Sequence, residues 1–144
     1  MTTDLALKLT RRISASPEAL FDAWLDPAML KRFISPGEGI ATVRAETDPR
    51  VGGRYDIVMH NEMGEVPHWG EYREIDRPNR LAFTWNSPHA VPDSLVTLTF
   101  RAVGDETEVT LVHDRFPSEA SRSGHESGWG SILRALDRAL GAAA

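Results

Sequence analysis

The sequence predicts an α+β fold, in which a curved antiparallel β-sheet of about six or seven strands wraps round one long C-terminal α-helix. Residues 40–114 alternate apolar and polar side chains in short runs separated by turn residues, as the strands of an antiparallel meander do. Residues 123–141 instead repeat large apolar side chains with the period of a helix. The chain of 144 residues is short enough to form a single domain, which we expect to span residues 1–144.

The N-terminal region predicts one strand followed by two short helices. Residues 5–13 place three leucines at alternate positions, as a strand with one buried face requires. The Ser-Pro pair at residues 16–17 then provides an N-cap and a first helical residue. The Asp-Pro pair at residues 26–27 repeats this signal for a second helix, which we expect to end before the Pro-Gly pair at residues 36–37.

The central region predicts six strands that follow one another along the chain. The expected strands are residues 40–47, 54–60, 66–75, 80–86, 95–102 and 107–114. Turn residues separate them, and the longest loop, residues 87–92, contains two prolines. Because most of the connections are short, we expect neighbouring strands to pair antiparallel and to offer one face of the sheet to the helix.

The C-terminal helix is expected over about residues 123–140. A Ser-x-x-Glu capping box begins at Ser123, and Gly141 fits the cap at the other end. The apolar side chains form one stripe, made by Trp129, Ile132, Leu133, Leu136 and Leu140. Gly128 and Gly130 each weaken such a helix by about 1 kcal/mol relative to alanine. They indicate that the helix passes close to the sheet or to a ligand there, or that it begins later.

The composition excludes several classes of function. The formal net charge is −5, so a nucleic-acid backbone is not an expected partner. No cysteine is present, which excludes disulfides and thiolate metal sites. The N-terminus lacks the apolar run of a signal peptide and no apolar stretch is long enough to span a membrane, so we expect a cytoplasmic protein. The five histidines show no metal-binding spacing and no phosphate-loop motif occurs, so neither a metal nor a cofactor is predicted.

A curved sheet around a single helix leaves a space that side chains need not fill, which is a natural site for a small ligand. The sequence predicts that this pocket is lined by Tyr55, Ile57, Met59, Phe83, Trp85, Val96, Leu98, Phe100, Leu111, His113, His125, Trp129, Ile132 and Leu133. As a set, these side chains suit an apolar or aromatic molecule. Each apolar member taken alone is more simply explained as hydrophobic core.

Three polar side chains are candidates for acid–base chemistry in the pocket. His113 shares the inward face of its strand, and His125 lies four residues before Trp129, on the same side of the helix. The simpler interpretation is that His113 is a hydrogen-bonded core residue and that His125 belongs to the helix cap. Glu71 is a third candidate if its side of the strand at residues 66–75 faces inward, a choice that the alternation leaves open.

Six segments together resemble one protein family. They are ASPEALFDAW at residues 15–24, GGRY at 52–55, GEYREI at 70–75, RLAFTW at 80–85, TEVTLVH at 107–113 and HESGW at 125–129. In combination they make the chain similar to stand-alone members of the family named after the activator of the heat-shock-protein-90 ATPase. That family belongs to the START-like (SRPBCC) superfamily with the helix-grip fold, which also contains polyketide cyclases and lipid-transfer domains. Family members often have tryptophan where this chain has Phe33.

The resemblance implies a helix-grip domain that binds a small hydrophobic ligand, as a carrier, a sensor or a stress-related binding protein. One alternative is a cyclase- or hydrolase-like enzyme that uses a pocket His or Glu, although no acid–base pair at a fixed spacing stands out. A second alternative is a chaperone-activating, protein-binding module, as the family name implies. The named activators carry a separate N-terminal domain, for which we expect no room in this chain. The sequence leaves open whether the chain forms a homodimer.

Overall fold

The computed structural model describes residues 5–34, 39–88 and 92–141, and within these ranges it confirms the predicted order of elements. The elements are β1 (Leu5–Ile13), α1 (Pro17–Ala23), α2 (Pro27–Phe33), β2 (Ala41–Thr47), β3 (Arg54–Asn61), β4 (Gly64–Asp76), β5 (Arg80–Trp85), β6 (Ser94–Val103), β7 (Glu106–Phe116) and α3 (Glu119–Leu140). Two predicted features, the helix stop at the Pro-Gly pair and the middle of the proline-containing loop, lie outside the described residues.

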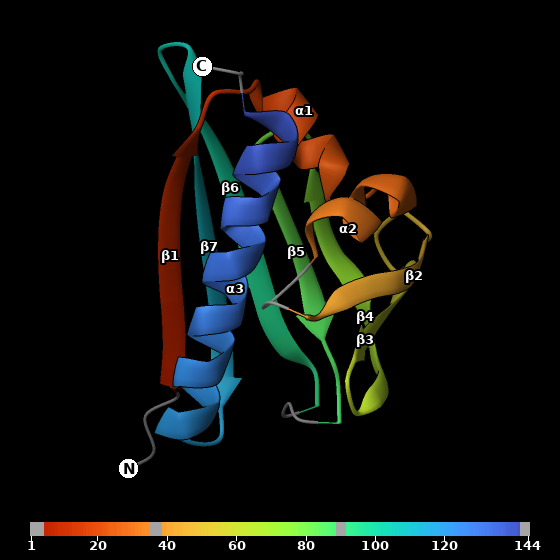
Figure 1. Cartoon of the computed structure of the whole chain (residues 1–144). Coiled ribbons are helices and arrows are strands. Elements are labelled where there is room, and N and C mark those ends of the chain that lie inside the picture. Colours follow the sequence, from red (N-terminus) through yellow and green to blue (C-terminus); the bar gives the residue numbers. More distant parts are fainter. Residues whose placement is uncertain (1–4, 35–38, 89–91, 142–144) are drawn as a thin grey trace.

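The seven strands form one antiparallel sheet in the order β1-β7-β6-β5-β4-β3-β2. Each strand from β2 to β7 pairs with its neighbour in the chain, and β1 pairs with the other side of β7. The sheet curves round α3, while α1 and α2 lie beside the C-terminal half of that helix (Figure 1). The predicted α+β, helix-grip architecture is therefore confirmed. None of the helices in the described part of the chain is long and apolar enough to cross a membrane.

The two short helices begin where their capping residues predict. The Ser16 hydroxyl accepts a hydrogen bond from the Ala19 amide at 3.1 Å. The Asp26 carboxylate accepts one from the Ala28 amide at 2.9 Å. A proline occupies the first position of each helix, where the missing N–H leaves no hydrogen bond unmade. Because both starts are capped, the two helices can hold their buried side chains over one end of the sheet.

The long helix α3 begins one turn earlier than the sequence predicts. Its N-cap is Ser118, whose hydroxyl accepts from the Ser121 amide at 3.1 Å, whereas the predicted cap, Ser123, is an exposed residue inside the helix. The reason is that residues 119–122 carry no large apolar side chain, so the period that indicates the helix cannot indicate its first turn. The predicted end at Gly141 is confirmed.

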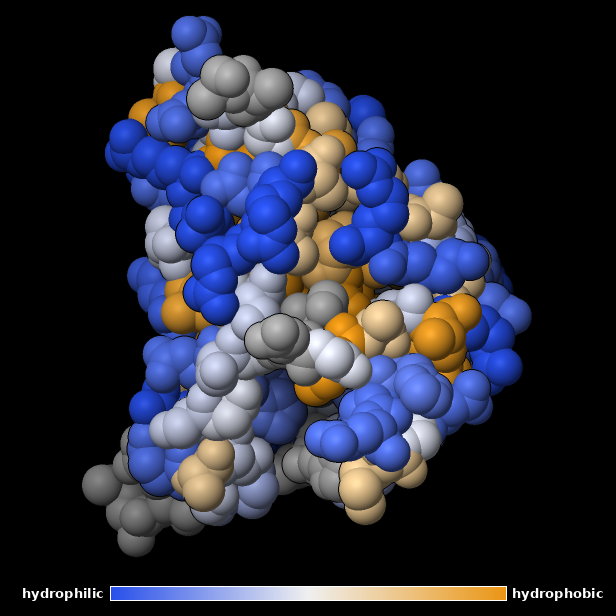
Figure 2. All heavy atoms as spheres, viewed as in Figure 1, coloured by the Kyte–Doolittle hydropathy of each residue, from blue (hydrophilic) through white to orange (hydrophobic). Residues whose placement is uncertain are grey.

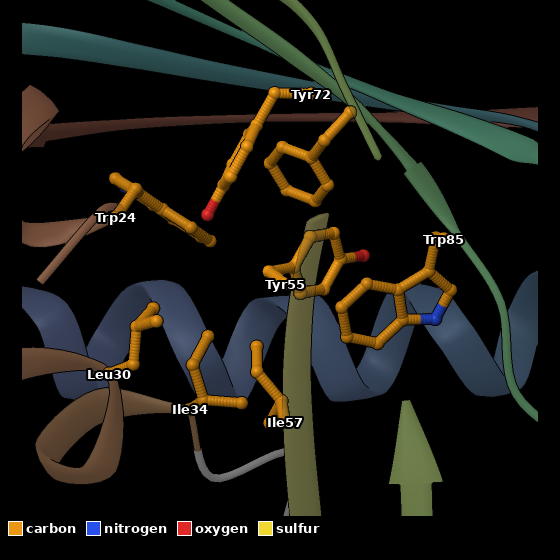
Figure 3. A pocket seen from close by; sticks show the side chains of 8 residues that line it. Trp24, Leu30, Ile34, Tyr55, Ile57, Tyr72 and Trp85 are labelled. Atoms are coloured by element: carbon orange, nitrogen blue, oxygen red, sulfur yellow. The ribbon is translucent and has the colours of Figure 1, made fainter. Parts of the chain in front are cut away.

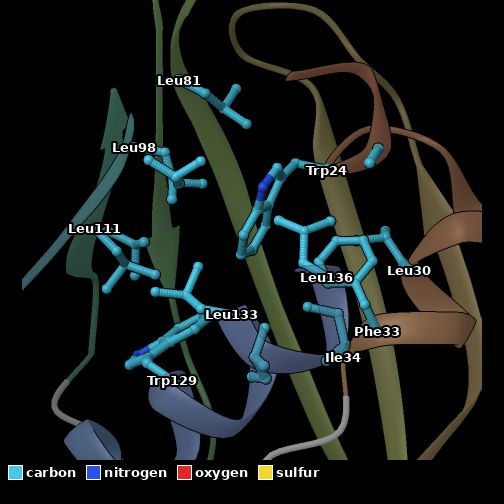
Figure 4. Packing of buried hydrophobic residues seen from close by; sticks show 14 of the residues in the cluster. Trp24, Leu30, Phe33, Ile34, Leu81, Leu98, Leu111, Trp129, Leu133 and Leu136 are labelled. Atoms are coloured by element: carbon cyan, nitrogen blue, oxygen red, sulfur yellow. The ribbon is translucent and has the colours of Figure 1, made fainter. Parts of the chain in front are cut away.

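The hydrophobic core lies between α3 and the concave face of the sheet. Figure 4 shows its central part, in which side chains of α3 meet side chains of β5, β6 and β7 and of the region of α1 and α2. Its labelled members are Trp129, Leu133, Leu136, Leu81, Leu98, Leu111, Trp24, Leu30, Phe33 and Ile34, each at most 4% exposed. This packing fills the middle of the space between the helix and the sheet.

Candidate functional site

A cleft of about 480 Å³ lies between the N-terminal half of α3 and strands β3, β4 and β5. It is lined by Met59, His68, Trp85, Ser87, Ala120, Ser121, Gly124, His125, Gly128, Trp129 and Ile132. Its volume falls within the range of about 300–1,000 Å³ that is typical of small-molecule sites. In the space-filling view, apolar side chains also reach the surface between α3 and the elements α2 and β2, although no residue of α2 or β2 lines the cleft (Figure 2). We therefore take this cleft as the candidate site.

Two tryptophans form the apolar wall of the cleft. Trp85, at the end of β5, and Trp129, on α3, have ring centroids 4.8 Å apart and planes inclined by 58°. Both side chains are almost fully buried, and Met59 and Ile132 extend the same apolar surface. Aromatic and thioether side chains of this kind offer a large and adaptable contact area to an apolar molecule.

His113 lies behind this wall and holds Trp129 in place. It is fully buried, and its Nδ1 accepts a hydrogen bond from the Trp129 indole N–H at 3.0 Å. The proton of the neutral ring must then sit on Nε2, which donates to the Ser94 hydroxyl at 2.9 Å. That hydroxyl donates in turn to the Trp85 carbonyl at 2.7 Å. Burial, with a smaller contribution from the nearby His125, lowers the pKa of His113 to about 3.

Both ring nitrogens of His113 are therefore engaged, and the ring does not line the cleft. A general base needs a nitrogen within hydrogen-bond reach of its substrate. The geometry matches the simpler interpretation, in which His113 is a hydrogen-bonded core residue. Its effect on the cleft is indirect, because it fixes the orientation of the Trp129 ring.

His125 lies in the wall of the cleft, on the first half of α3. Its Nδ1 is 2.8 Å from the Ser121 carbonyl, so this nitrogen carries a proton and donates it to that oxygen. The ring packs against Phe116, with centroids 4.9 Å apart, and lies 5.3 Å from the His113 ring. Its Nε2 makes no hydrogen bond within the described residues, so this nitrogen is available to a ligand.

Glu71 lies on the outer face of the sheet. Gly70 and Tyr72 are buried, and the alternation of a strand then puts the side chain between them on the opposite face. The Glu71 side chain is 45% exposed, and its carboxylate is 3.4 Å from Arg73 Nε. Glu71 would be a candidate only if its carboxylate faced inward. Its carboxylate faces outward, so Glu71 is not a candidate.

Most of the other predicted pocket residues are packed core. Tyr55, Ile57 and Phe83 border a separate void of only about 10 Å³, together with Trp85 and side chains from the region of α1 and α2 (Figure 3). A void of that size is at the lower limit for one water molecule, about 10–15 Å³. The predicted residues that line neither space are Val96, Leu98, Phe100, Leu111, His113 and Leu133.

Several lining residues are absent from the sequence prediction, namely His68, Ser87, Ala120, Ser121, Gly124 and Gly128. Ala120, Gly124 and Gly128 are spaced four residues apart, so they follow one side of α3. Small side chains at this spacing leave a groove beside a helix, and this signal becomes visible once the helix extends to Glu119. The alternative that α3 begins after its glycines is wrong. A Cβ added at Gly124 would meet no atom of the described residues within 4 Å, so relative to these residues the helix there borders open space.

The described residues contain no group of three or more His, Asp or Glu side chains placed to hold a metal ion. Two histidines, His68 and His125, line the cleft, and no described carboxylate lines it with them. Protein zinc sites use three or four side-chain ligands. The described lining of the cleft therefore does not supply the ligand set of a protein zinc site.

The fold and the cleft define the class of this protein. A curved antiparallel sheet that holds a long C-terminal helix, with a cleft between the two, is a helix-grip domain. The family model described as Activator of Hsp90 ATPase homolog 1-like protein matches residues 14–141. The chain belongs to this family, which confirms the resemblance seen in its sequence.

Solved structures are similar over almost the whole chain. Protein CV1439 from Chromobacterium violaceum has a TM-score of 0.83 at 24% identity, covering 94% of this chain and 96% of that chain. The AHSA1 protein from Silicibacter pomeroyi has a TM-score of 0.79 at 28% identity, with the same coverage of 94% and 96%. The AHSA1-like protein from Aeromonas hydrophila has a TM-score of 0.76 at 24% identity, covering 92% and 90%. No curated protein matches the sequence.

Proposed function

We propose that the chain binds a small, largely apolar molecule in the cleft between α3 and the sheet. The observation that carries this proposal is the cleft itself, about 480 Å³ in volume and walled by Trp85, Trp129, Met59 and Ile132. Apolar side chains around a space of this size bury most of the surface of a small ligand. Such binding fits a carrier, a sensor or a stress-related binding protein.

An enzymatic function has less support in the side chains of the cleft. His113 has both nitrogens engaged, and Glu71 lies on the outer face of the sheet. His125 is the one predicted acid–base residue that lines the cleft. No described lining residue is a carboxylate that could orient it, as the partner in a catalytic pair does. Ligand binding therefore accounts for more of the site than proton transfer does.

A chaperone-activating function is the other alternative that the family raises. One similar structure is that of an HSP90 activator from Plasmodium falciparum, with a TM-score of 0.74 at 23% identity over 94% of this chain and 95% of that chain. At this identity the likeness extends to the fold alone. The cleft belongs to this chain, so it supports ligand binding more directly than the relative supports a chaperone partner.

A native mass spectrum of the freshly purified protein, recorded beside its denatured mass, is the first test. We expect a discrete extra mass that is lost on denaturation, because a ligand that binds only the folded chain is released when the chain unfolds. A stoichiometric protein partner in its place would favour the chaperone alternative and contradict the proposal. The same spectrum counts the subunits and so tests the open prediction of a homodimer.

A variant that fills the cleft gives a sharper test. A Cβ at Gly124 would meet no atom of the described residues within 4 Å, so Gly124→Leu should extend its side chain into the cleft that this glycine lines. Binding of the neutral apolar dye phenylnaphthylamine, followed by its fluorescence, should be lost. The helix should become more stable by about 0.5–1 kcal/mol, because glycine is the weaker helix former.

The matched control is Gly130→Ala, which removes a glycine of the same helix outside the cleft. Its added Cβ would lie 3.5 Å from the Arg134 guanidinium, an ordinary contact. This variant should also stabilise the helix but bind the dye as the wild type does. Equal dye binding by Gly124→Leu and the control would contradict the proposal, as would a wild-type chain that binds no dye.

A further inference from the structure

Two polar atoms beside the cleft have no hydrogen-bond partner among the described residues. One is Nε1 of Trp85, a residue only 4% exposed, and the other is Oγ of Ser121. Both residues line the cleft. The second tryptophan of the wall, Trp129, differs because its indole N–H donates to His113 at 3.0 Å. In Figure 3 the Trp85 nitrogen lies on the side of the ring turned away from the small void.

An unpartnered indole N–H calls for an explanation; among the described residues Trp24 Nε1 shares this state, but Trp85 is the one that lines the cleft. The great majority of buried polar groups in folded proteins are hydrogen-bonded, because leaving one unpaired destabilises the structure. An indole N–H can only donate, so the group that completes it must be an acceptor. Trp85 already forms the wall of the cleft, and a shift of its ring toward a ligand breaks no existing hydrogen bond of this N–H.

The acceptor that fits this wall is uncharged. The described lining residues include no Asp, Glu, Lys or Arg. Apart from the imidazoles of His68 and His125, a carboxylate placed there would meet no basic side chain of these residues, so a neutral carbonyl is less costly to bury. Ser121 is the third residue of α3, close to the positive end of the helix dipole, which favours the partial negative charge of an oxygen atom.

We propose that the ligand is an uncharged, largely apolar molecule with one carbonyl-type oxygen, which accepts a hydrogen bond from Trp85 Nε1. This inference rests on the proposed ligand-binding function and specifies the class of ligand. The Ser121 hydroxyl is a second unpartnered donor in the lining of the cleft, while the rings of Trp85 and Trp129 pack against the apolar body of the molecule. Ketones, esters and amides belong to this class, whereas hydrocarbons and ionised carboxylic acids do not.

A matched pair of probes tests the inference. Methyl naphthyl ketone and its isopropenyl analogue have nearly the same shape, but the analogue has a methylene group in place of the oxygen. Isothermal titration calorimetry measures the affinity of each probe for the wild-type chain and for Trp85→Phe, which keeps an aromatic ring and removes the N–H. The affinity ratio of ketone to analogue should fall about 2- to 12-fold in the variant, which corresponds to one hydrogen bond. The desolvation of the ketone cancels in this comparison.

Two further readouts keep the inference open to refutation if Trp85→Phe fails to fold. In the wild-type chain, the proton resonance of the Trp85 indole N–H should move downfield with the ketone but not with the analogue. Ser121→Ala should lower the same affinity ratio, whereas Ser127→Ala, at an exposed position of the same helix outside the cleft, should leave it unchanged.

The outcomes separate the inference from the function on which it rests. If both probes bind, and the ratio is the same in the wild type, Trp85→Phe and Ser121→Ala, the carbonyl contact is refuted while ligand binding stands. A lower ratio in Trp85→Phe alone supports the contact and assigns it to the indole. If the wild-type chain binds neither probe nor the dye, ligand binding itself fails and the inference fails with it.

Discussion

The burial of His113 predicts that the protein loses stability as the solution becomes mildly acidic. Burial, and to a smaller extent the nearby His125, lower the pKa of this ring in the folded chain to about 3, whereas its ordinary value is 6.5. Below pH 6.5 His113 is protonated in the unfolded chain but stays neutral in the folded chain. The free energy of unfolding must therefore decrease as the pH falls. The contribution is complete above the unfolded pKa and is lost as the pH falls toward the folded pKa.

The size of this loss follows from the two pKa values. One pKa unit corresponds to about 1.36 kcal/mol. Lowering the pH to about 5 should therefore remove about 2 kcal/mol, and reaching the folded pKa should remove about 4–5 kcal/mol in total. A domain typically has an unfolding free energy of about 5–15 kcal/mol, so the effect is large enough to measure.

Urea unfolding followed by circular dichroism, between about pH 7.5 and pH 5, measures the loss. His113→Asn is the comparison, because its amide oxygen can still accept from the Trp129 N–H while the titrating ring is gone. The variant should be less stable at neutral pH, since Ser94 loses its partner and a smaller side chain leaves a space. Between neutral pH and about pH 5, the wild type should lose about 2 kcal/mol more of its free energy of unfolding than the variant loses. If both chains lost the same free energy of unfolding between about pH 7.5 and pH 5, the His113 ring would titrate with an ordinary pKa. That result would refute the buried hydrogen bonds of His113.

Four further substitutions test the fold and the site by urea unfolding, and one of them also by dye binding. Leu136→Ala, at a fully buried position of α3, should lower the free energy of unfolding by about 2–5 kcal/mol, and a change within about 0.5 kcal/mol would contradict the packing. Ser118→Ala should cost about 1 kcal/mol because it removes the N-cap, whereas Ser123→Ala should have little effect; the reverse order would favour the later helix start. Glu71→Gln should change stability by at most about 1 kcal/mol and leave dye binding intact, and loss of binding would contradict its outward position.

The order of elements could be predicted because its signals are local, whereas the start of α3 could not. Ser118 and Ser123 both have the side chain of an N-cap, and residues 119–122 lack the apolar side chains that would decide between them. The choice depends on how the chain leaves β7, which is a tertiary property. The first turn of α3, which the sequence does not predict, contains Ala120 and Ser121. Both residues line the cleft, so the predicted cleft lining lacks them as well.

The composition of the site could be predicted only in part. Alternation along the strands identifies the side chains that face the helix, and the predicted residues that do line the cleft are Met59, Trp85, His125, Trp129 and Ile132. Alternation says nothing about where along that face the space stays open. That depends on Trp24, Leu30 and Ile34, which reach the interior from α1 and α2 and border the small void in its middle. Their position over the sheet follows from long-range packing and leaves no local pattern.

The side chains at the two ends of the interior explain why one end is filled and the other is open. Beside the C-terminal half of α3, Trp24 and Phe33 pack with ring centroids 4.9 Å apart. Beside the N-terminal half, α3 presents Ala120, Gly124 and Gly128 to the cleft. Packing among the described residues does not require glycine at position 124, since an added Cβ would meet none of their atoms within 4 Å. Glycine there weakens the helix by about 1 kcal/mol relative to alanine. A residue that weakens its helix and is not needed for packing leaves space beside the helix, which fits the proposal that the cleft binds a ligand.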